Sequence, residues 1–309
     1  MAEVSEAHAI SLSQHVTALR QAFGSSRWAG EIGVTLTEAF YRWKYDTPAG
    51  QAIIAYVRNG ARPVSGVSAF PLIFNLPGRG PIKGWQIGDI MTAPEMRGRG
   101  LYRECLSDIV QRLDDQLLIC FPNGQSQRAI EQAGFRAVAE VQTFVRPILP
   151  VIGGRLSEDQ NEINFLDLSA VVSKNPPYSS VHRDAKYLAW RYEQHPAFSY
   201  QVIGGGAEGF AIVRSFRLFG MNVAIVMEFH STEGLAARLL HKVQRWTGKN
   251  GMVAVFLMAN WFPFKPLRSG YFFVPPSLMP KQQVLFVRYP RAQTVDLRWR
   301  TQIGDWDGL

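Results

Sequence analysis

The residues best suited to chemistry lie in a glycine-rich turn at residues 94–101, which reads Pro-Glu-Met-Arg-Gly-Arg-Gly-Leu. Gly98 and Gly100 have no side chains that would keep a ligand away from the backbone. Where such a turn opens a helix, the first amides lack partners within the helix, and the helix dipole adds partial positive charge. Arg97 and Arg99 raise the local potential further. The turn therefore predicts an anion cradle, and a pyrophosphate is the anion that suits it best.

A strand before the turn and a helix after it must hold the cradle in place. Four apolar residues before the turn have the short, turn-bounded run of a buried strand: Trp85, Ile87, Ile90 and Met91. Four apolar residues after it recur at the three- and four-residue intervals of an amphipathic helix: Leu106, Ile109, Val110 and Leu113. Two other phosphate loops do not fit. A Walker A loop ends in Gly-Lys-Ser/Thr, and a dinucleotide fingerprint needs a third glycine where Arg103 stands.

The turn resembles the acyl-CoA loop of the GNAT acyltransferase superfamily, usually written Arg/Gln-x-x-Gly-x-Gly/Ala. In that family the loop amides hold the coenzyme A pyrophosphate, and the preceding strand pairs with the pantetheine arm. The resemblance implies that the phosphates would be lined by Arg97, Gly98, Arg99, Gly100, Leu101 and Tyr102. It also implies that the pantetheine would meet backbone groups of Met91, Thr92 and Ala93. The sequence departs from the family at Tyr102, where Gly or Ala is usual.

A second motif of the family follows at the matching distance. Residues 117–121 form a short apolar strand, followed by Asn123 and then by Gly134 and Phe135. The resemblance implies that Asn123 helps to hold the coenzyme. In the family, the helix after this Asn often carries a Tyr that protonates the departing thiolate, and the matching residue here is Ile130.

The resemblance implies transfer of an acyl group from acetyl-CoA, or another acyl-CoA, to an amine by direct attack in a ternary complex. Asp89 precedes the pantetheine segment and is our candidate base; a capping or salt-bridging carboxylate is the alternative interpretation. Strand amides near Met91 or Thr92 would meet the oxyanion. Tyr102 would protonate the thiolate in place of the missing tyrosine. No metal is expected, since no His/Cys spacing or paired helical carboxylates suggest a site.

Composition places the chain among soluble globular proteins. Its 309 residues suffice for two domains, with 47% hydrophobic and 19% charged residues and no apolar run of the ~18 residues that a membrane helix needs. Two cysteines and no visible signal peptide favour the cytoplasm. The net charge of +8 favours anionic partners, of which coenzyme A is one. Nucleic acid is not favoured, because no dense basic run is interleaved with aromatics.

An internal repeat divides the chain into halves. Residues 187–192 (Tyr-Leu-Ala-Trp-Arg-Tyr) are similar to residues 40–45 (Phe-Tyr-Arg-Trp-Lys-Tyr), and the same order of strands follows each. This indicates domain duplication. We expect an α/β (α+β, mixed-sheet) fold of two GNAT-like domains in tandem, with the first at residues 1–148, a linker at 149–175 and a degenerate second domain at 176–309.

The other expected elements follow from the same patterns. We expect helices at residues 7–23 and 36–44, a strand pair at 52–57 and 64–74, and a closing strand at 136–146. At the second strand-to-helix junction, residues 229–234 (Phe-His-Ser-Thr-Glu-Gly) lack the cradle, and Glu233 would repel phosphate. His230 is expected to be structural. The tail, with Asp305 and Asp307, is expected to be solvated or to bind a cationic acceptor.

Two other functions remain open at this stage. A non-catalytic coenzyme-binding or scaffold protein is suggested by Ile130 and by the degenerate half. Tandem domains of this fold also transfer aminoacyl groups from charged tRNA, although the intact cradle favours coenzyme A. The acceptor amine, on a small molecule, sugar or peptide, is not readable from the sequence, and the oligomeric state is left open.

Overall fold

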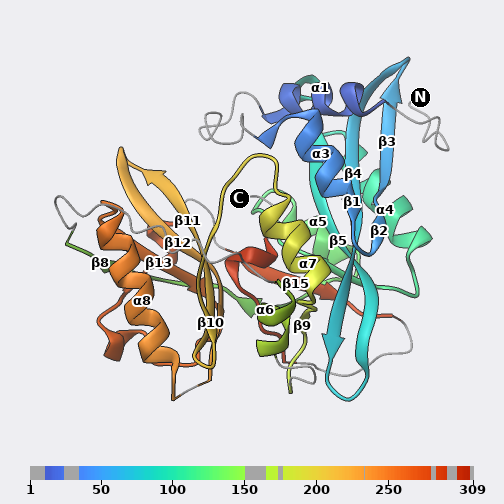
Figure 1. Ribbon diagram of the computed structural model, residues 1–309. Helices are drawn as coiled ribbons and strands as arrows, with labels where there is room; N and C mark the ends of the chain where they lie inside the picture. Colours follow the sequence, from blue (N-terminus) through green and yellow to red (C-terminus); the bar gives the residue numbers. More distant parts are fainter. Residues whose placement is uncertain are drawn as a thin grey trace.

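The computed structural model describes residues 11–23, 35–149, 165–172, 177–232, 234–279, 283–290 and 298–306. Two mixed sheets lie side by side, each carrying helices (Figure 1). The expected α/β class, with mixed sheets in two halves, is confirmed.

The first half supplies the helices and strands around the glycine-rich turn. Its elements are α1 (Leu12–Phe23), α3 (Glu38–Tyr45), β1 (Asp46–Thr47), β2 (Gly50–Gln51), β3 (Ile53–Asn59), β4 (Arg62–Leu76), β5 (Gly80–Thr92), η1 (Pro94–Met96), α4 (Leu101–Arg112), β6 (Leu117–Cys120), α5 (Gln127–Gln132) and β7 (Arg136–Glu140). These bounds lie within a few residues of the expected helices and strands, and residues 7–10 of the first expected helix lie outside the described chain. β5 and β6 run parallel and are connected through α4.

The side chains of β3 alternate between two hydrophobic cores, one on each face of the sheet. Ala55 and Val57 pack with α4, whereas Ile54 and Tyr56 pack with α1 and α3, because successive strand residues point to opposite faces. The sheet leading to the glycine-rich turn is therefore covered on both sides.

The second half repeats this order. Its elements are α6 (Phe165–Val171), β9 (Ser180–Val181), α7 (Ala185–Leu188), the π-helical η2 (Ala189–Glu193), β10 (Gln201–Gly206), β11 (Gly209–Leu218), β12 (Met221–His230), α8 (Ala236–Lys249), β13 (Ala254–Ala259), η3 (Leu267–Ser269), β14 (Phe272–Val274), η4 (Pro276–Leu278), β15 (Val284–Arg288) and η5 (Ile303–Asp305). β12 and β13 are parallel and are connected through α8. The expected linker at 149–175 contains α6, whose Phe165 and Leu168 are buried; residues 150–164 lie outside the described chain.

The two halves exchange a strand. β8 (Gln142–Pro147) leaves the first half and pairs between β13 and β14, while β15 pairs between β6 and β7. The sheet orders are therefore β3-β4-β5-β6-β15-β7 and β10-β11-β12-β13-β8-β14. The single closing strand expected at residues 136–146 is two strands, of which only β7 stays in the first sheet. Sheet pairing thus crosses the expected boundary at residue 148.

Two tryptophans from the repeated motif meet where the halves join. Trp43 Nε1 donates to the carbonyl of Trp190 at 2.7 Å, and Trp190 Nε1 donates to the carbonyl of Trp43 at 3.0 Å. Their rings stack with centroids 4.9 Å apart. A contact in which each residue does to the other what the other does to it is isologous. The two copies of the repeated motif are therefore related to each other at this contact by a pseudo-two-fold axis.

Candidate functional site

The glycine-rich turn leaves five consecutive amides without partners. Gly98 and Gly100 have φ values of 79° and 78°, with open space where a Cβ would stand. Within the described part of the chain, the amides of residues 98–100 donate no backbone hydrogen bond. Those of Leu101 and Tyr102 are in the first turn of α4, where an amide has no acceptor within the helix, and the Arg103 amide bonds back to the Gly100 carbonyl at 2.8 Å. Residues 98–100 are also exposed. The predicted anion cradle is therefore open and unsatisfied at the start of α4, where the helix dipole favours negative charge.

The two arginines of the turn have different surroundings. Arg97 donates to the carbonyls of Thr92 at 3.3 Å and Ala22 at 3.1 Å, which ties the turn to the end of α1. Arg99 is exposed, and the described residues offer it no partner. Arg97 therefore positions the turn, and Arg99 is the side chain left to attract an anion.

Next to the cradle, β5 and β6 separate. Their pairing ends at Ile87 and Cys120, while β4 continues to pair with β5 as far as Thr92. Across the described residues, no strand pairs with Gly88–Thr92 on the β6 side. We call this opening the first wedge. The first wedge lies along the C-terminal part of β5, which leads into the glycine-rich turn.

The predicted pantetheine contacts at the end of β5 are partly engaged. The Met91 carbonyl accepts from Ser65 Oγ at 3.0 Å, and the Ala93 amide donates to the Val64 carbonyl at 2.8 Å. A carbonyl can accept twice, but an amide can donate only once. Because Ala93 bonds to Val64, the alternation of an antiparallel ladder turns the Met91 carbonyl towards Gly66 of β4. The Thr92 carbonyl faces away from β4 and can still accept from a ligand, whereas the Ala93 amide cannot donate to one.

Asp89, the predicted base, is held by three side chains. Its Oδ1 accepts from Lys44 Nζ at 2.8 Å, and its Oδ2 accepts from Tyr45 Oη at 2.9 Å and Ser68 Oγ at 3.0 Å. Burial alone would raise the pKa of Asp89, but the Lys44 ammonium lowers it below its ordinary value. A carboxylate with a low pKa is a weak base near neutral pH. The geometry supports the salt-bridging interpretation of Asp89.

The Asp89 contacts extend into a buried chain that the sequence did not reveal. An ionised Asp89 only accepts, so Tyr45 donates to it, and His15 Nε2 donates to Tyr45 Oη at 2.7 Å. His15 Nδ1 then accepts from Tyr56 Oη at 2.6 Å. Burial lowers the pKa of His15 to about 4, which keeps the ring neutral. Lys44 and Tyr45 could have been found from the repeated motif, whereas His15 carries no sequence signal.

The second half contains the same kind of pair. Tyr192, which corresponds to Tyr45 in the repeat, donates to Glu228 on β12 at 2.7 Å. Arg183 takes the place of the lysine and meets the same carboxylate at 2.6 Å. His230 bonds to Glu228 at 2.8 Å and stacks on Phe210, in the structural role expected for it. The second half lacks the glycine cradle but keeps the tyrosine–carboxylate pair. We therefore assign the pair to holding the strand that carries the carboxylate, which is β5 in the first half and β12 in the second.

Tyr102 is in the first turn of α4, and Asn123 lies in the turn before α5. Tyr102 Oη donates to the Ser126 carbonyl at 3.3 Å, and burial raises the pKa of Tyr102, so the hydroxyl keeps its proton. Asn123 Oδ1 accepts from the amides of Gln125 at 3.1 Å and Ser126 at 3.0 Å, which forms a turn just before α5. The Asn123 oxygen is therefore already used. Ile130 is fully buried in the core and offers nothing to the site.

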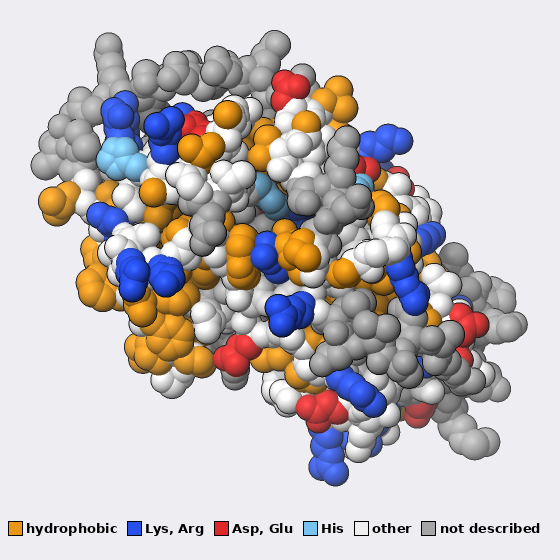
Figure 2. All heavy atoms as spheres, turned by 90° about the horizontal axis from the view of Figure 1, so that it is seen from below, with side chains coloured by type: hydrophobic (Ala, Val, Ile, Leu, Met, Phe, Trp, Pro, Cys, Tyr) orange, Lys and Arg blue, Asp and Glu red, His pale blue; other side chains and the backbone are white. Residues whose placement is uncertain are grey.

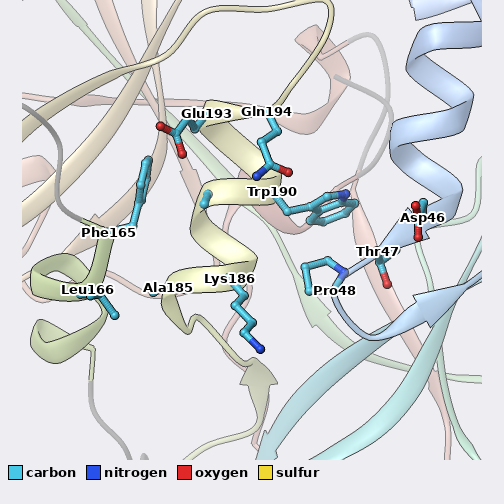
Figure 3. Close-up of a pocket in the computed structure, with 11 residues that line it drawn as sticks. Asp46, Thr47, Pro48, Phe165, Leu166, Ala185, Lys186, Trp190, Glu193 and Gln194 are labelled. Carbon is cyan, nitrogen blue, oxygen red and sulfur yellow. The ribbon is translucent and has the colours of Figure 1, made fainter.

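A separate open groove of about 960 Å³ lies between the halves. In Figure 3, residues 46–48, just after α3, face Lys186, Trp190 and Gln194 from the second half. No cradle residue lines this groove. Its first lining residue, Asp46, directly follows Lys44 and Tyr45 in the sequence, and those two residues hold Asp89.

The described surface and interior give few other chemical sites. On the face in Figure 2, basic side chains are scattered among apolar and polar ones and form no continuous band. Among the residues with described positions, no group of three or more His, Cys, Asp or Glu could hold a metal ion. None of the described helices is both long and apolar enough to cross a membrane.

Comparison with known proteins gives a family match for the first half and similar folds for the whole chain. Residues 3–130 match the family model described as the acetyltransferase (GNAT) domain. No curated protein matches the sequence. Among solved structures, a GCN5-related N-acetyltransferase from Anabaena variabilis is 14% identical with a TM-score of 0.62, over 94% of this chain and 73% of that chain. One from Kribbella flavida is 15% identical with a TM-score of 0.60, over 94% and 73%.

Eis1 from Mycobacterium abscessus is 12% identical with a TM-score of 0.55, over 94% of this chain and 74% of its own. At these identities the similarity shows the fold, and it extends over both halves.

Proposed function

Because residues 3–130 match the model of the acetyltransferase (GNAT) domain, we propose that the protein is an acyl-CoA-dependent N-acyltransferase that uses acetyl-CoA as donor. The observation that carries the proposal is the row of five unpartnered amides at residues 98–102, beside the first wedge. A helix start with free amides binds phosphate through hydrogen bonds and through its dipole. The wedge offers an unpaired strand edge to an extended arm.

In this proposal the chain supplies binding and orientation. The cradle amides and Arg99 would hold the pyrophosphate, and the edge of β5 at Met91 and Thr92 would direct the thioester into the wedge. A neutral amine would attack the thioester carbonyl directly, and an amide at the end of β5 would stabilise the oxyanion. Tyr102 remains our proposed donor of a proton to the thiolate, because its hydroxyl is protonated and lies near the cradle.

Asp89 is proposed to be a positioning residue. With φ at 48°, it lies at a bulge where two residues of β5 oppose one residue of β4. Lys44 and Tyr45 fix its carboxylate and so fix the direction of the following residues. The amine would lose its proton to solvent, and the acceptor would enter through the groove between the halves, where Asp46 and Glu193 provide carboxylates for a cation.

Titration with acetyl-CoA tests the proposal most directly. We expect Gly100→Glu to weaken acetyl-CoA binding at least 100-fold, measured by calorimetry, because a carboxylate would enter the cradle. Gly78→Glu is the matched control, since Gly78 has φ 73° and the same open space, in the β4–β5 turn. If both variants bind like the wild type, the cradle is not a phosphate site. The same titration separates coenzyme A from charged tRNA as donor.

A coenzyme-binding protein without catalysis is the second candidate, because Ile130 replaces the hydroxyl that the family often has there. Release of free thiol from acetyl-CoA over a panel of amines separates the two. Amine-dependent thiol release supports the transferase. Tight acetyl-CoA binding without thiol release for any amine would favour the binding protein.

A further inference from the structure

The second half has a wedge of its own. β12 and β13 pair in parallel only as far as Val226 and Leu257, after which the two strands separate. This is the counterpart of the first wedge, where β5 and β6 separate beyond Ile87 and Cys120. We call it the second wedge.

Residues 298–306 fill the second wedge and bond to both of its sides. On the β13 side, the Asn260 amide donates to the Thr301 carbonyl at 3.2 Å, and the Thr301 amide donates to Asn260 Oδ1 at 2.9 Å. On the β12 side, the Phe229 amide donates to Gln302 Oε1 at 2.7 Å. Gln302 Nε2 donates in turn to Glu228 Oε2 at 2.9 Å. One glutamine side chain therefore satisfies both a strand amide and a buried carboxylate.

Charge and shape fix the segment further. Asp305 is buried and pairs with Arg183 at 2.6 Å, so this aspartate is neither solvated nor free for a cationic acceptor; Asp307 lies outside the described residues. Gly304 has no room for a side chain, because a Cβ there would collide with Tyr192 Oη and stand 2.7 Å from Glu228 Oε1. Ile303 is fully buried. Hydrogen bonds, an ion pair and close packing therefore hold this segment in place.

We propose that the second half is a peptide-binding domain whose ligand is the chain's own segment 298–306. The segment occupies the place that, in the first half, the pantetheine arm would take. This correspondence rests on the proposed function, whereas the contacts of the segment do not. The consequence is one coenzyme site per chain, with the second wedge held open by protein in place of coenzyme.

The test removes the segment and returns it as a separate molecule. A chain ending at residue 297 should bind a fluorescein-labelled peptide of residues 298–309, measured by fluorescence anisotropy, while the full chain should not. Peptides carrying Gln302→Ala or Asp305→Asn should bind at least tenfold more weakly, and a scrambled peptide should not bind. The proposal is overturned if the folded truncated chain ignores the peptide, or if the full chain binds it equally well.

Where the truncated chain does not fold, hydrogen exchange decides. Gln302→Ala in the full chain should accelerate exchange of the Phe229 amide at least tenfold, with Val255 in the centre of β13 as the unaffected reference; unchanged exchange at Phe229 rejects the proposal. In calorimetry, the full chain should take up one acetyl-CoA, and two would contradict the blocked second wedge. No binding of acetyl-CoA at all would count against the proposed function and leave the peptide result standing.

Discussion

Asp89 has a left-handed backbone, with φ at 48°, which costs a residue other than glycine about 1–2 kcal/mol. The contacts of its carboxylate with Lys44, Tyr45 and Ser68 offset this cost. The bulge at Asp89 changes the direction of the end of β5, where the first wedge opens. The strained backbone of this residue therefore helps to set the geometry of the proposed coenzyme site.

We expect Asp89→Asn to lower the free energy of unfolding by about 3–5 kcal/mol, because it leaves the Lys44 ammonium buried without its counter-charge. Urea denaturation measures this, and adding Lys44→Met should recover much of the loss. Affinity for acetyl-CoA should also fall as the end of β5 relaxes. Unchanged affinity with lost turnover would instead assign Asp89 the role of a base.

Because His15 is buried and neutral, we expect the free energy of unfolding to fall in mild acid. Its pKa is lowered to about 4 by burial, against ~6.5 in an unfolded chain. The folded state binds fewer protons between these values, so its stability is complete above pH 6.5 and falls as pH drops towards 4. We expect this residue to cost about 2 kcal/mol at pH 5 relative to pH 7. His15→Gln should remove that part of the pH dependence in urea denaturation, and an identical pH profile in both proteins would contradict the assignment.

At the scale of elements, the exchanged strands decide how the halves depend on each other. β15 lies between β6 and β7, and β8 lies between β13 and β14. Without β15, both β6 and β7 would present unpaired edges, which promote aggregation. β9 of the second half also pairs with β4. Neither sheet is complete within its own half.

We therefore expect a protein of residues 1–149 to be unfolded or insoluble when expressed alone, and the same for residues 150–309. Co-expression of the two should give a soluble complex that co-purifies with the circular dichroism of the intact chain. A folded, monomeric 1–149 fragment in gel filtration would show that the exchanged strand is dispensable.

At the scale of the molecule, the halves are joined through their own repeated motif. The Trp43–Trp190 pair lies beside a core that draws buried residues from both sheets, including Phe74 and Phe210. Reciprocal hydrogen bonds and one shared core favour cooperative unfolding of the whole chain over separate transitions.

Trp190→Ala should lower the free energy of unfolding by about 3–5 kcal/mol, as expected for a large buried aromatic residue, and should keep a single transition in urea. Because Trp43 loses its partner at the same time, the double variant with Trp43→Ala should cost less than the sum of the single variants. Additive effects in this cycle would show that the two tryptophans do not act as a pair.

Local features of this protein follow from short stretches of its sequence. The glycine-rich turn was readable because Gly98 and Gly100 favour a positive φ and because a strand–turn–helix order is encoded by neighbours in the chain. The duplication was readable because a tryptophan-containing motif occurs twice. Both depend on residues a few positions apart, where periodicity and turn chemistry are specific.

Contacts between residues far apart in the chain became visible with the fold. It paired Lys44 and His15 with the Asp89 chain, moved β8 and β15 into opposite sheets, and placed Gln302 in the second wedge. A strand's pattern shows which face is buried but not which sheet it joins. The sequence position of a carboxylate likewise does not show whether a buried cation lies beside it in the fold. The pairing of Asp89 with Lys44, and the position of segment 298–306 in the second wedge, were therefore visible only in the folded structure.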